Sequence, residues 1–211
     1  MTYLSSLEPN PGPVVLDTSV LINIHKSTYG IDVLLHIPNK KYITSIVIDE
    51  MIRSTHQKDG ADKFIDSMVS GGILDIAFLS EEEFEIYEQL TSGNPSLDDG
   101  EASTIAVSKH RNATPVIDEK KGRNRSKQLL PDNTPYWSLD LFRHSNVVNQ
   151  LGHKKSSEAV YLALKEGRMR IHQDHCDSVV EIIGAKRAVN CHSLPNYKSR
   201  RAEWSESPPV C

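Results

Sequence analysis

The sequence has few cysteines, no long apolar run and no excess of positive charge. Its three cysteines are widely spaced and odd in number, so they do not form a disulfide framework. No apolar run approaches the roughly 18 residues that suggest a membrane helix, and the first residues lack the basic and apolar regions of a signal peptide. We therefore expect a cytoplasmic protein without a membrane partner.

The charge balance restricts how the protein can contact nucleic acid. Its formal net charge of −4 excludes a protein that coats nucleic acid through bulk positive charge, so any contact must come from a local patch. With 38% hydrophobic and 25% charged residues, the composition is that of an ordinary globular protein. A chain of 211 residues suffices for one domain with an extension.

Short apolar runs alternate with amphipathic segments along the first two thirds of the chain. The runs predict strands at residues 14–17, 42–44, 71–79 and 114–118. Helices are predicted from Thr18 or Ser19, after a Ser45 cap, from a Ser80/Glu83 capping box, from an S-x-x-D signature at Ser96, and over 119–130. Because strands alternate with helices, we predict a parallel α/β fold.

The two ends of the chain show weaker patterns. Residues 1–13 end in a Pro/Gly cluster, which indicates a loop. Residues 156–169 and 175–184 are predicted to be amphipathic helices that pack on the core or on a second subunit, whereas the segment after residue 184 has no periodicity. The predicted organisation is an N-terminal loop over 1–13, a main domain over 14–150, a helical extension over 151–184 and a flexible tail over 185–211.

Four acidic residues stand where a parallel sheet would bring them together. Asp17 and Asp118 end the first and fourth predicted strands, Glu50 lies one turn beyond the second, and Glu101 lies near the start of the helix before the fourth. The carboxyl ends of parallel strands and the helix starts after them meet at one sheet edge. Clustered carboxylates repel unless a cation neutralises them, and such oxygen ligands suit Mg²⁺ or Mn²⁺, ions that promote phosphodiester hydrolysis.

Three of the four acids also have an ordinary interpretation. Asp17 alone fits a helix cap, and Glu50 alone fits a solvated helix residue. Glu101, with two acids shortly before it, fits an acidic first helical turn. The order and context of the four acids, rather than any one of them, favour a shared site.

In these segments the sequence resembles the PIN-domain family. The matching segments are VVLDTSVLIN (14–23), ITSIVIDEM (43–51), LDDGEASTIAVS (97–108) and PVIDEKKGR (115–123), within residues 14–145. The resemblance implies a three-layer α/β/α sandwich with a central parallel sheet, followed here by the helical extension. It also implies Mg²⁺ or Mn²⁺ and a metal-dependent endoribonuclease that hydrolyses RNA. Many small bacterial members are toxins held inactive by an antitoxin, usually as dimers, so the resemblance adds an antitoxin and a homodimer to the expected partners.

The resemblance assigns the metal-holding and catalytic roles to Asp17, Glu50, Glu101 and Asp118. Three further residues are matched as auxiliary groups near the metal: Ser19, Asp99 and Glu119. Asp99 could take the place of Glu101, and Glu119 the place of Asp118, because each pair is close in sequence.

A basic segment directly follows Asp118. Residues 120–127 carry five cations and no acid, and we predict that Lys120, Lys121, Arg123 and Arg125 hold substrate phosphates. The alternative is a solvated face of a helix. The segment lacks aromatic residues, so it does not indicate base stacking.

Three other interpretations compete with a nuclease. The spacing of His172, His175, Cys176, Cys191 and His192 fits none of the usual zinc patterns and favours a surface segment. A haloacid-dehalogenase-like phosphatase would carry a second acid two residues after the first, where this chain has Ser19. A non-catalytic PIN-like module that binds RNA or a partner is the remaining alternative, and it differs from the nuclease by binding RNA without cleaving it.

Overall fold

The computed structural model describes residues 3–8, 10–54 and 60–206, which divide into two compact units. We call residues 10–22 and 38–137 the sheet unit, and residues 1–9, 23–37 and 138–211 the helical unit. These boundaries differ from the predicted division at residues 150 and 151. Residues 23–37 and 138–150 belong with the C-terminal helices because the helix over 30–36 packs against the helices that follow residue 138.

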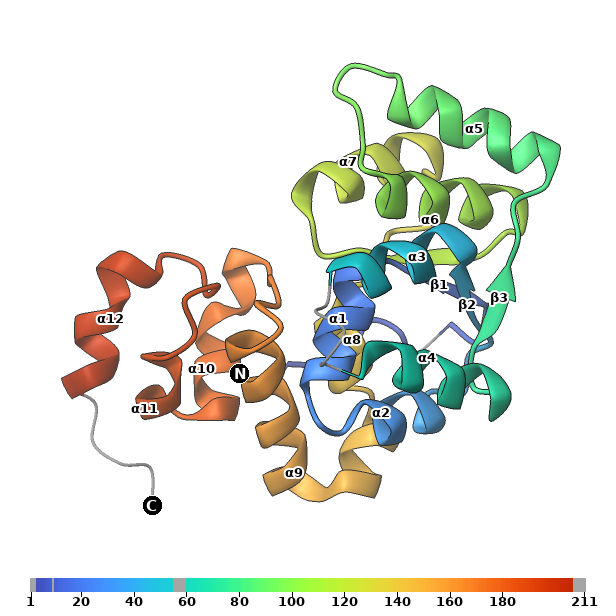
Figure 1. Cartoon of the computed structure of the whole chain (residues 1–211). Helices are drawn as coiled ribbons and strands as arrows, with labels where there is room; N and C mark the ends of the chain where they lie inside the picture. The colour runs from blue at the N-terminus through green and yellow to red at the C-terminus, as the bar shows by residue number, and fades with distance from the viewer. Residues whose placement is uncertain (1–2, 9, 55–59, 207–211) are drawn as a thin grey trace. The chain divides into compact units, whose positions relative to one another are not determined.

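The sheet unit is built on four short parallel strands in the order β3-β2-β1-β4 (Figure 1). Their bounds are β1 Val14–Leu16, β2 Lys41–Thr44, β3 Asp75–Ala77 and β4 Thr114–Val116. All three residues of β1 are fully buried, as expected for a central strand with no polar side chain. Every strand overlaps one of the predicted apolar runs, although β3 takes up only three residues of the run over 71–79 and β2 begins one residue before its run.

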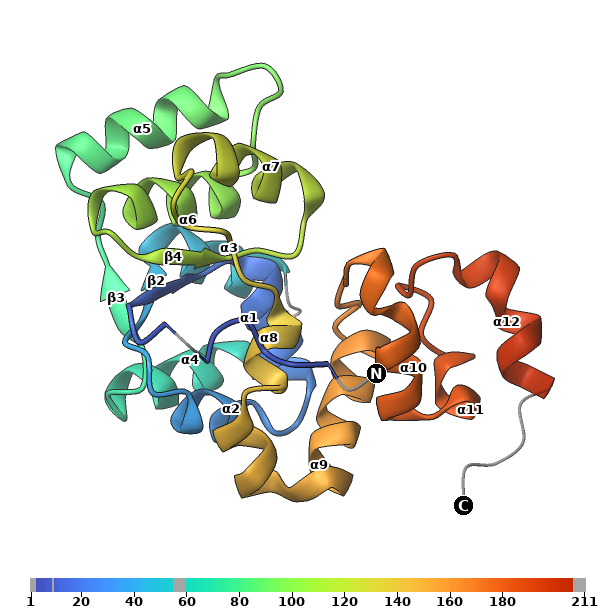
Figure 2. The same cartoon turned by 180° about the vertical axis from the view of Figure 1, so that it is seen from behind.

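Helices cover both faces of this sheet. They are α1 Thr18–Lys26, whose last residues from Asn23 belong to the helical unit, α3 Ser45–Ser54, α4 Ala61–Ser70, α5 Glu81–Thr91, α6 Asp99–His110 and α7 Lys120–Leu129. Helix α6 contacts β1, β2 and β4, and α5 packs on α6. Figures 1 and 2 show α5 and α6 on one side of the sheet and α4 on the other, which confirms the α/β/α class.

Local side chains set where the helices begin. The predicted capping box is present at α5, since Ser80 Oγ accepts from Glu83 N and Glu83 Oε2 accepts from Ser80 N. At α6 the predicted capping residue, Ser96, is wrong. The cap is Asp98, whose Oδ1 accepts a hydrogen bond from Glu101 N at 2.8 Å. Helix α3 follows β2 without a loop, so its cap is the Thr44 hydroxyl rather than Ser45.

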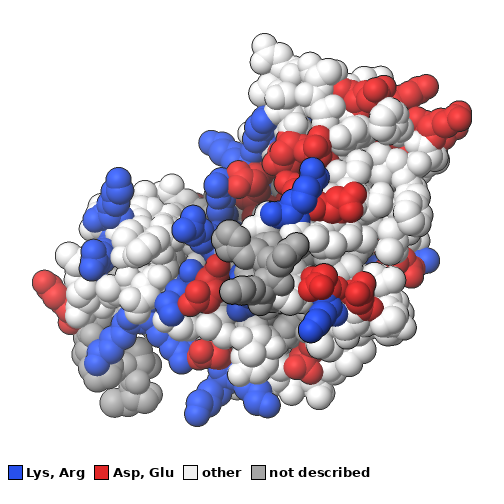
Figure 3. Space-filling model, viewed as in Figure 1, with Lys and Arg blue, Asp and Glu red and all other residues white. Residues whose placement is uncertain are grey.

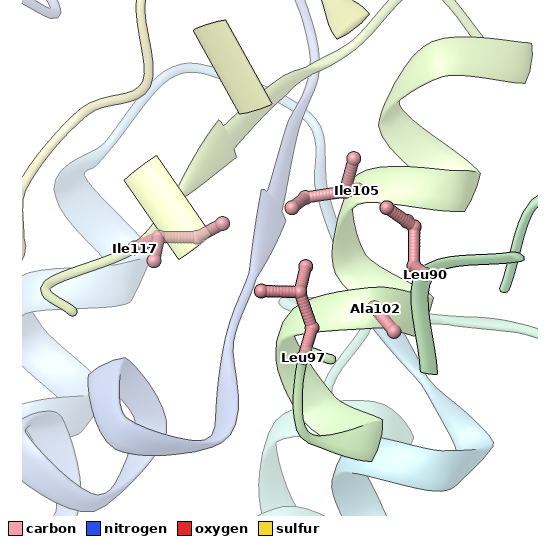
Figure 4. Packing of buried hydrophobic residues seen from close by; sticks show 5 residues of the cluster. All are labelled: Leu90, Leu97, Ala102, Ile105 and Ile117. Atoms are coloured by element: carbon pink, nitrogen blue, oxygen red, sulfur yellow. The ribbon is translucent and has the colours of Figure 1, made fainter. Parts of the chain in front are cut away.

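A cluster of apolar side chains holds α6 beside the end of β4. Figure 4 shows its members, which are Leu90, Leu97, Ala102, Ile105 and Ile117. They come from α5, the connection after it, α6 and the residue directly after β4. Their packing places the first turn of α6, which carries Glu101, close to the carboxyl edge of the sheet.

The helical unit contains the remaining elements. They are α2 Gly30–His36, α8 Ser138–Phe142, α9 Ser145–Lys165, a 3-10 turn η1 at Gln173–His175, α10 Cys176–Ile183, α11 Ala185–Ala188 and α12 Tyr197–Glu206. Gly152 interrupts α9 with a φ of 73°. The predicted helices over 156–169 and 175–184 correspond to the second part of α9 and to α10, and both bury apolar residues. Within the described residues, no helix combines the length and apolarity needed to cross a membrane.

The predicted flexible tail is wrong for residues 185–206. Helices α11 and α12 form there and pack on each other, with Trp204 only 2% exposed. The segment has too few apolar residues to show periodicity. The buried side chain of Trp204 nevertheless supplies a large apolar area that stabilises the packed helices. Residues 207–211 lie outside the described part. The N-terminal residues 3–8 are a loop, as predicted, and Asp140 Oδ1 accepts bonds from Tyr3 Oη and Ser6 N.

Candidate functional site

The candidate site lies where the strand order of the sheet reverses. The chain runs from β1 through β2 to β3 and then returns to β4 on the other side of β1, and such switch points form ligand crevices at the carboxyl ends of strands. Leu16 is in register with Val116, and Asp17 N donates to the Val116 carbonyl at 3.2 Å. Asp17 and Asp118 therefore follow neighbouring strands at one edge of the sheet.

Asp17 is a buried carboxyl group held by its own helix start. It is 3% exposed, and its Oδ2 accepts bonds from Ser19 Oγ at 2.7 Å and Ser19 N at 3.3 Å. Burial is the main reason that the pKa of Asp17 rises to about 7, and the charges of Asp98 and Glu50 raise it further against the opposing effect of Ser19. Ser19 therefore orients the carboxyl group of Asp17 through these two hydrogen bonds.

Glu50 and Thr18 meet Asp17 against the backbone of Gly100. Thr18 Oγ1 donates to Glu50 Oε2 at 2.7 Å. A methyl group at Gly100 would stand 2.5 Å from each of these two oxygens and 3.1 Å from Asp17 Oδ1. Three oxygen-bearing side chains therefore converge on the first turn of α6, and only glycine leaves room for them.

Glu101 makes an equivalent approach to the start of α7. It is 2% exposed, and its Oε1 accepts a bond from Gly122 N at 3.1 Å. A methyl group at Gly122 would lie 2.7 Å from the Glu101 Cδ atom. Burial, followed by the charges of Asp98, Asp17 and Glu119, raises the pKa of Glu101 to about 8.

The auxiliary acids are arranged differently from the prediction. Glu119 is close enough to Glu101 for its charge to raise the pKa of that carboxyl group. Asp99 instead accepts a bond from Tyr87 Oη at 2.7 Å, while Asp98 acts electrostatically on both Asp17 and Glu101. Sequence reasoning missed this role of Asp98, although its position directly before the helix was a usable signal.

The prediction that Arg123 holds substrate phosphate is wrong. Arg123 is 6% exposed, and its guanidinium group donates to the carbonyls of Ile117, Pro135 and Tyr136 at 2.7 Å each. Its Cζ atom also lies 3.6 Å from the centre of the Trp137 ring. Arg123 therefore joins the segment after β4 to the connection that follows α7. Lys120 and Lys121 remain exposed at the start of α7, and Arg125 is half-buried beside Gln128.

We expect Arg123→Gln to destabilise the protein by about 3 kcal/mol or more, because buried carbonyls lose charge-assisted donors. Arg125→Gln on the same helix is the matched control and should change the free energy of unfolding by less than about 0.5 kcal/mol. Urea unfolding of both variants measures the difference. Equal stability of the two would contradict the structural role given to Arg123.

The carboxylates fit a hard divalent cation, although they do not form a finished site by themselves. Among the described residues, no group of three or more His, Cys, Asp or Glu side chains is arranged as a ready-made metal site. In the same part of the chain, no Lys or Arg forms an ion pair with Asp17, Glu50 or Glu101. Buried carboxylates without a cation are costly, and oxygen donors of this kind suit Mg²⁺ or Mn²⁺.

Comparison with known proteins gives one family. No curated protein shows significant similarity to the chain. A family model described as PIN domain matches residues 13–130, which include all four predicted acids. PIN domains are in general nucleases that use divalent metal ions. Since the match covers more than half of the 211 residues and the parallel sheet agrees with it, the chain belongs to the PIN-domain family.

Proposed function

We propose that the chain is a Mg²⁺- or Mn²⁺-dependent endoribonuclease that hydrolyses RNA phosphodiester bonds. The observation that carries the proposal is the pair of buried carboxyl groups of Asp17 and Glu101, whose pKa values rise to about 7 and 8. Neither forms an ion pair with Lys or Arg among the described residues. Such perturbed groups cluster at functional sites, and a cation removes the cause of the perturbation.

The residues of the site have three proposed roles: holding the cation, orienting the carboxyl groups and binding substrate phosphates. Asp17, Glu50, Glu101 and Asp118 would hold the cation, which when bound supplies stabilisation of the charge that develops on the phosphoryl group. Ser19 orients Asp17, and Thr18 orients Glu50. Lys120, Lys121 and Arg125 on α7 supply positive charge for the substrate phosphates at the helix start that Glu101 contacts.

The test is a cleavage time course on several structured and single-stranded RNAs, with Mg²⁺, with Mn²⁺ and with EDTA. The full chain should cleave at least one RNA with either metal, and EDTA should stop the reaction. Cleavage that persists in EDTA would contradict the proposal. RNA binding without cleavage under all conditions would favour the alternative, a non-catalytic PIN-like module. The toxin role and the antitoxin partner rest on the family resemblance alone.

A glycine at the site offers a sharper test of the geometry. Gly100→Ala should lower the affinity for Mn²⁺ about 10- to 100-fold, because the new methyl group displaces Glu50 and Thr18. Alanine is otherwise favourable in a helix, so α6 itself should persist. Titration calorimetry measures the change. Ser108→Ala, which removes a buried hydroxyl on α6 that has no hydrogen-bond partner within the described chain, is the control with unchanged affinity. Equal Mn²⁺ affinities of Gly100→Ala and wild type would show that Gly100 does not shape the metal site.

A further inference from the structure

The two units differ in charge. The helical unit carries twelve Lys and Arg against ten Asp and Glu, whereas the sheet unit carries twelve against eighteen. Figure 3 shows Lys and Arg spread over the region of α9 to α12, and Asp and Glu gathered along α5. The protein is proposed to bind a polyanion, yet its net positive charge lies in the helical unit and the four candidate metal-binding acids lie in the sheet unit.

Two adjoining hollows open in the helical unit and share His192. One has a volume of about 510 Å³ and is lined by Lys165, Arg168 and Arg170 near the end of α9. The other has a volume of about 620 Å³ and includes Lys198 at the start of α12. We call them together the His192 hollow. Its other polar lining consists of amide, hydroxyl and imidazole groups, and its one acid, Glu166, is paired with Lys165 at 2.8 Å.

The backbone at Arg168 indicates that its side chain is used. Arg168 has a φ of 59°, a left-handed conformation that favours glycine and is uncommon for arginine. The preceding Gly167 is required for another reason, since a methyl group there would stand 2.6 Å from Asn23 Oδ1. Keeping an arginine where glycine costs less is typical of functional positions. Within the described residues, neither Arg168 nor Lys198 forms an ion pair or a hydrogen bond through its side chain.

We propose that the His192 hollow binds phosphate groups of an RNA strand. That the strand is the substrate rests on the proposed nuclease function, whereas phosphate binding rests on the hollow itself. Guanidinium and ammonium groups bind phosphate oxygens, and the side-chain amides of Asn190 and Asn196 add hydrogen-bond donors. Such contacts position a strand without reading its sequence. The hollow therefore supplies affinity for RNA that the acidic sheet unit lacks.

The test compares two double variants of the full chain in EDTA, so that cleavage does not interfere. Arg168→Gly with Lys198→Gln removes two cations from the hollow, and glycine suits the left-handed backbone, so Tm should stay within a few degrees of wild type. Lys154→Gln with Lys155→Gln removes the same charge from exposed positions of α9 that do not line the hollow. Fluorescence anisotropy with a labelled single-stranded RNA gives Kd across a series of salt concentrations.

We expect the first pair to weaken RNA binding about tenfold and to lower the salt slope by about one to two. The control pair should change Kd by less than about threefold. Equal Kd values and equal slopes for the two pairs would overturn the proposal. Displacement of the RNA by an equal nucleotide concentration of 5′-AMP would also overturn it, because the ligand would then be a single nucleotide.

The result is separable from the nuclease proposal. If Arg168→Gly with Lys198→Gln weakens RNA binding but wild type cleaves no RNA, the proposal that the hollow binds RNA is supported and the nuclease proposal fails. If wild type cleaves RNA with metal and both pairs bind RNA like wild type, the nuclease stands and the hollow fails.

Discussion

Asp17→Asn should reduce RNA cleavage at least about 1,000-fold, which corresponds to about 4 kcal/mol of lost transition-state stabilisation. Asparagine keeps the size of the side chain and an oxygen that Ser19 can bond, but it removes the charge that would hold the cation. The carboxyl group of Asp17 also interacts electrostatically with Asp98, Glu50 and Glu101. Single-turnover rates with excess protein measure the effect on the reaction rather than on binding.

Two controls accompany this variant. Asp66→Asn removes an exposed acid from α4 in the same unit and should cleave RNA at the wild-type rate. RNA binding by Asp17→Asn in EDTA should be no weaker than wild type, because the variant loses a negative charge. An Asp17→Asn protein that cleaves within tenfold of wild type would show that this cluster is not the active site.

The sequence was informative about the sheet and its edge because strand burial and strand ends leave local signals. The run VVL is apolar at every position, and in the structure it is the buried central strand. Asp17 and Asp118 directly follow such runs, so parallel topology alone brings them to one edge. The capping box at Ser80 is equally local, and it is present as predicted.

Long-range contacts explain what could not be predicted. Arg123 looks like its basic neighbours in sequence, but its role depends on carbonyl groups of residues 117, 135 and 136 that only folding brings together. The role of Gly100 depends on Glu50, which lies 50 residues earlier in the sequence. Residues 23–37 gave no sign that they would join the C-terminal helices, because their apolar residues fit either unit.

Metal-free wild-type protein should lose stability as the pH rises from about 4 to 7, relative to Asp17→Asn. The pKa of Asp17 is about 7 in the folded protein and close to 4 in the unfolded chain, so the folded state binds the proton more tightly. Stability from this group is therefore complete below pH 4, falls between pH 4 and 7, and is lost above pH 7. The slope reaches about 1.4 kcal/mol per pH unit where only the folded state is protonated.

Asp17→Asn removes this dependence and should be more stable than wild type at pH 8 by a few kcal/mol. At pH 4 the two proteins should unfold with nearly the same free energy. Urea unfolding in EDTA at several pH values gives the difference between them, which cancels the titration of distant groups. Asp66→Asn, which removes an exposed acid from α4, is the matched control in the same measurement.

Added Mn²⁺ should reverse the order at pH 8. A cation that binds only the folded state stabilises it by mass action, and it neutralises the carboxylates whose repulsion caused the loss. Wild type should therefore gain Tm with Mn²⁺ at pH 8 and much less at pH 5, because Asp17 and Glu101 must release protons before they bind the ion. Asp17→Asn should respond weakly at both pH values. An equal Tm gain in wild type and variant would place the metal away from Asp17 and leave the raised pKa values as a consequence of burial alone.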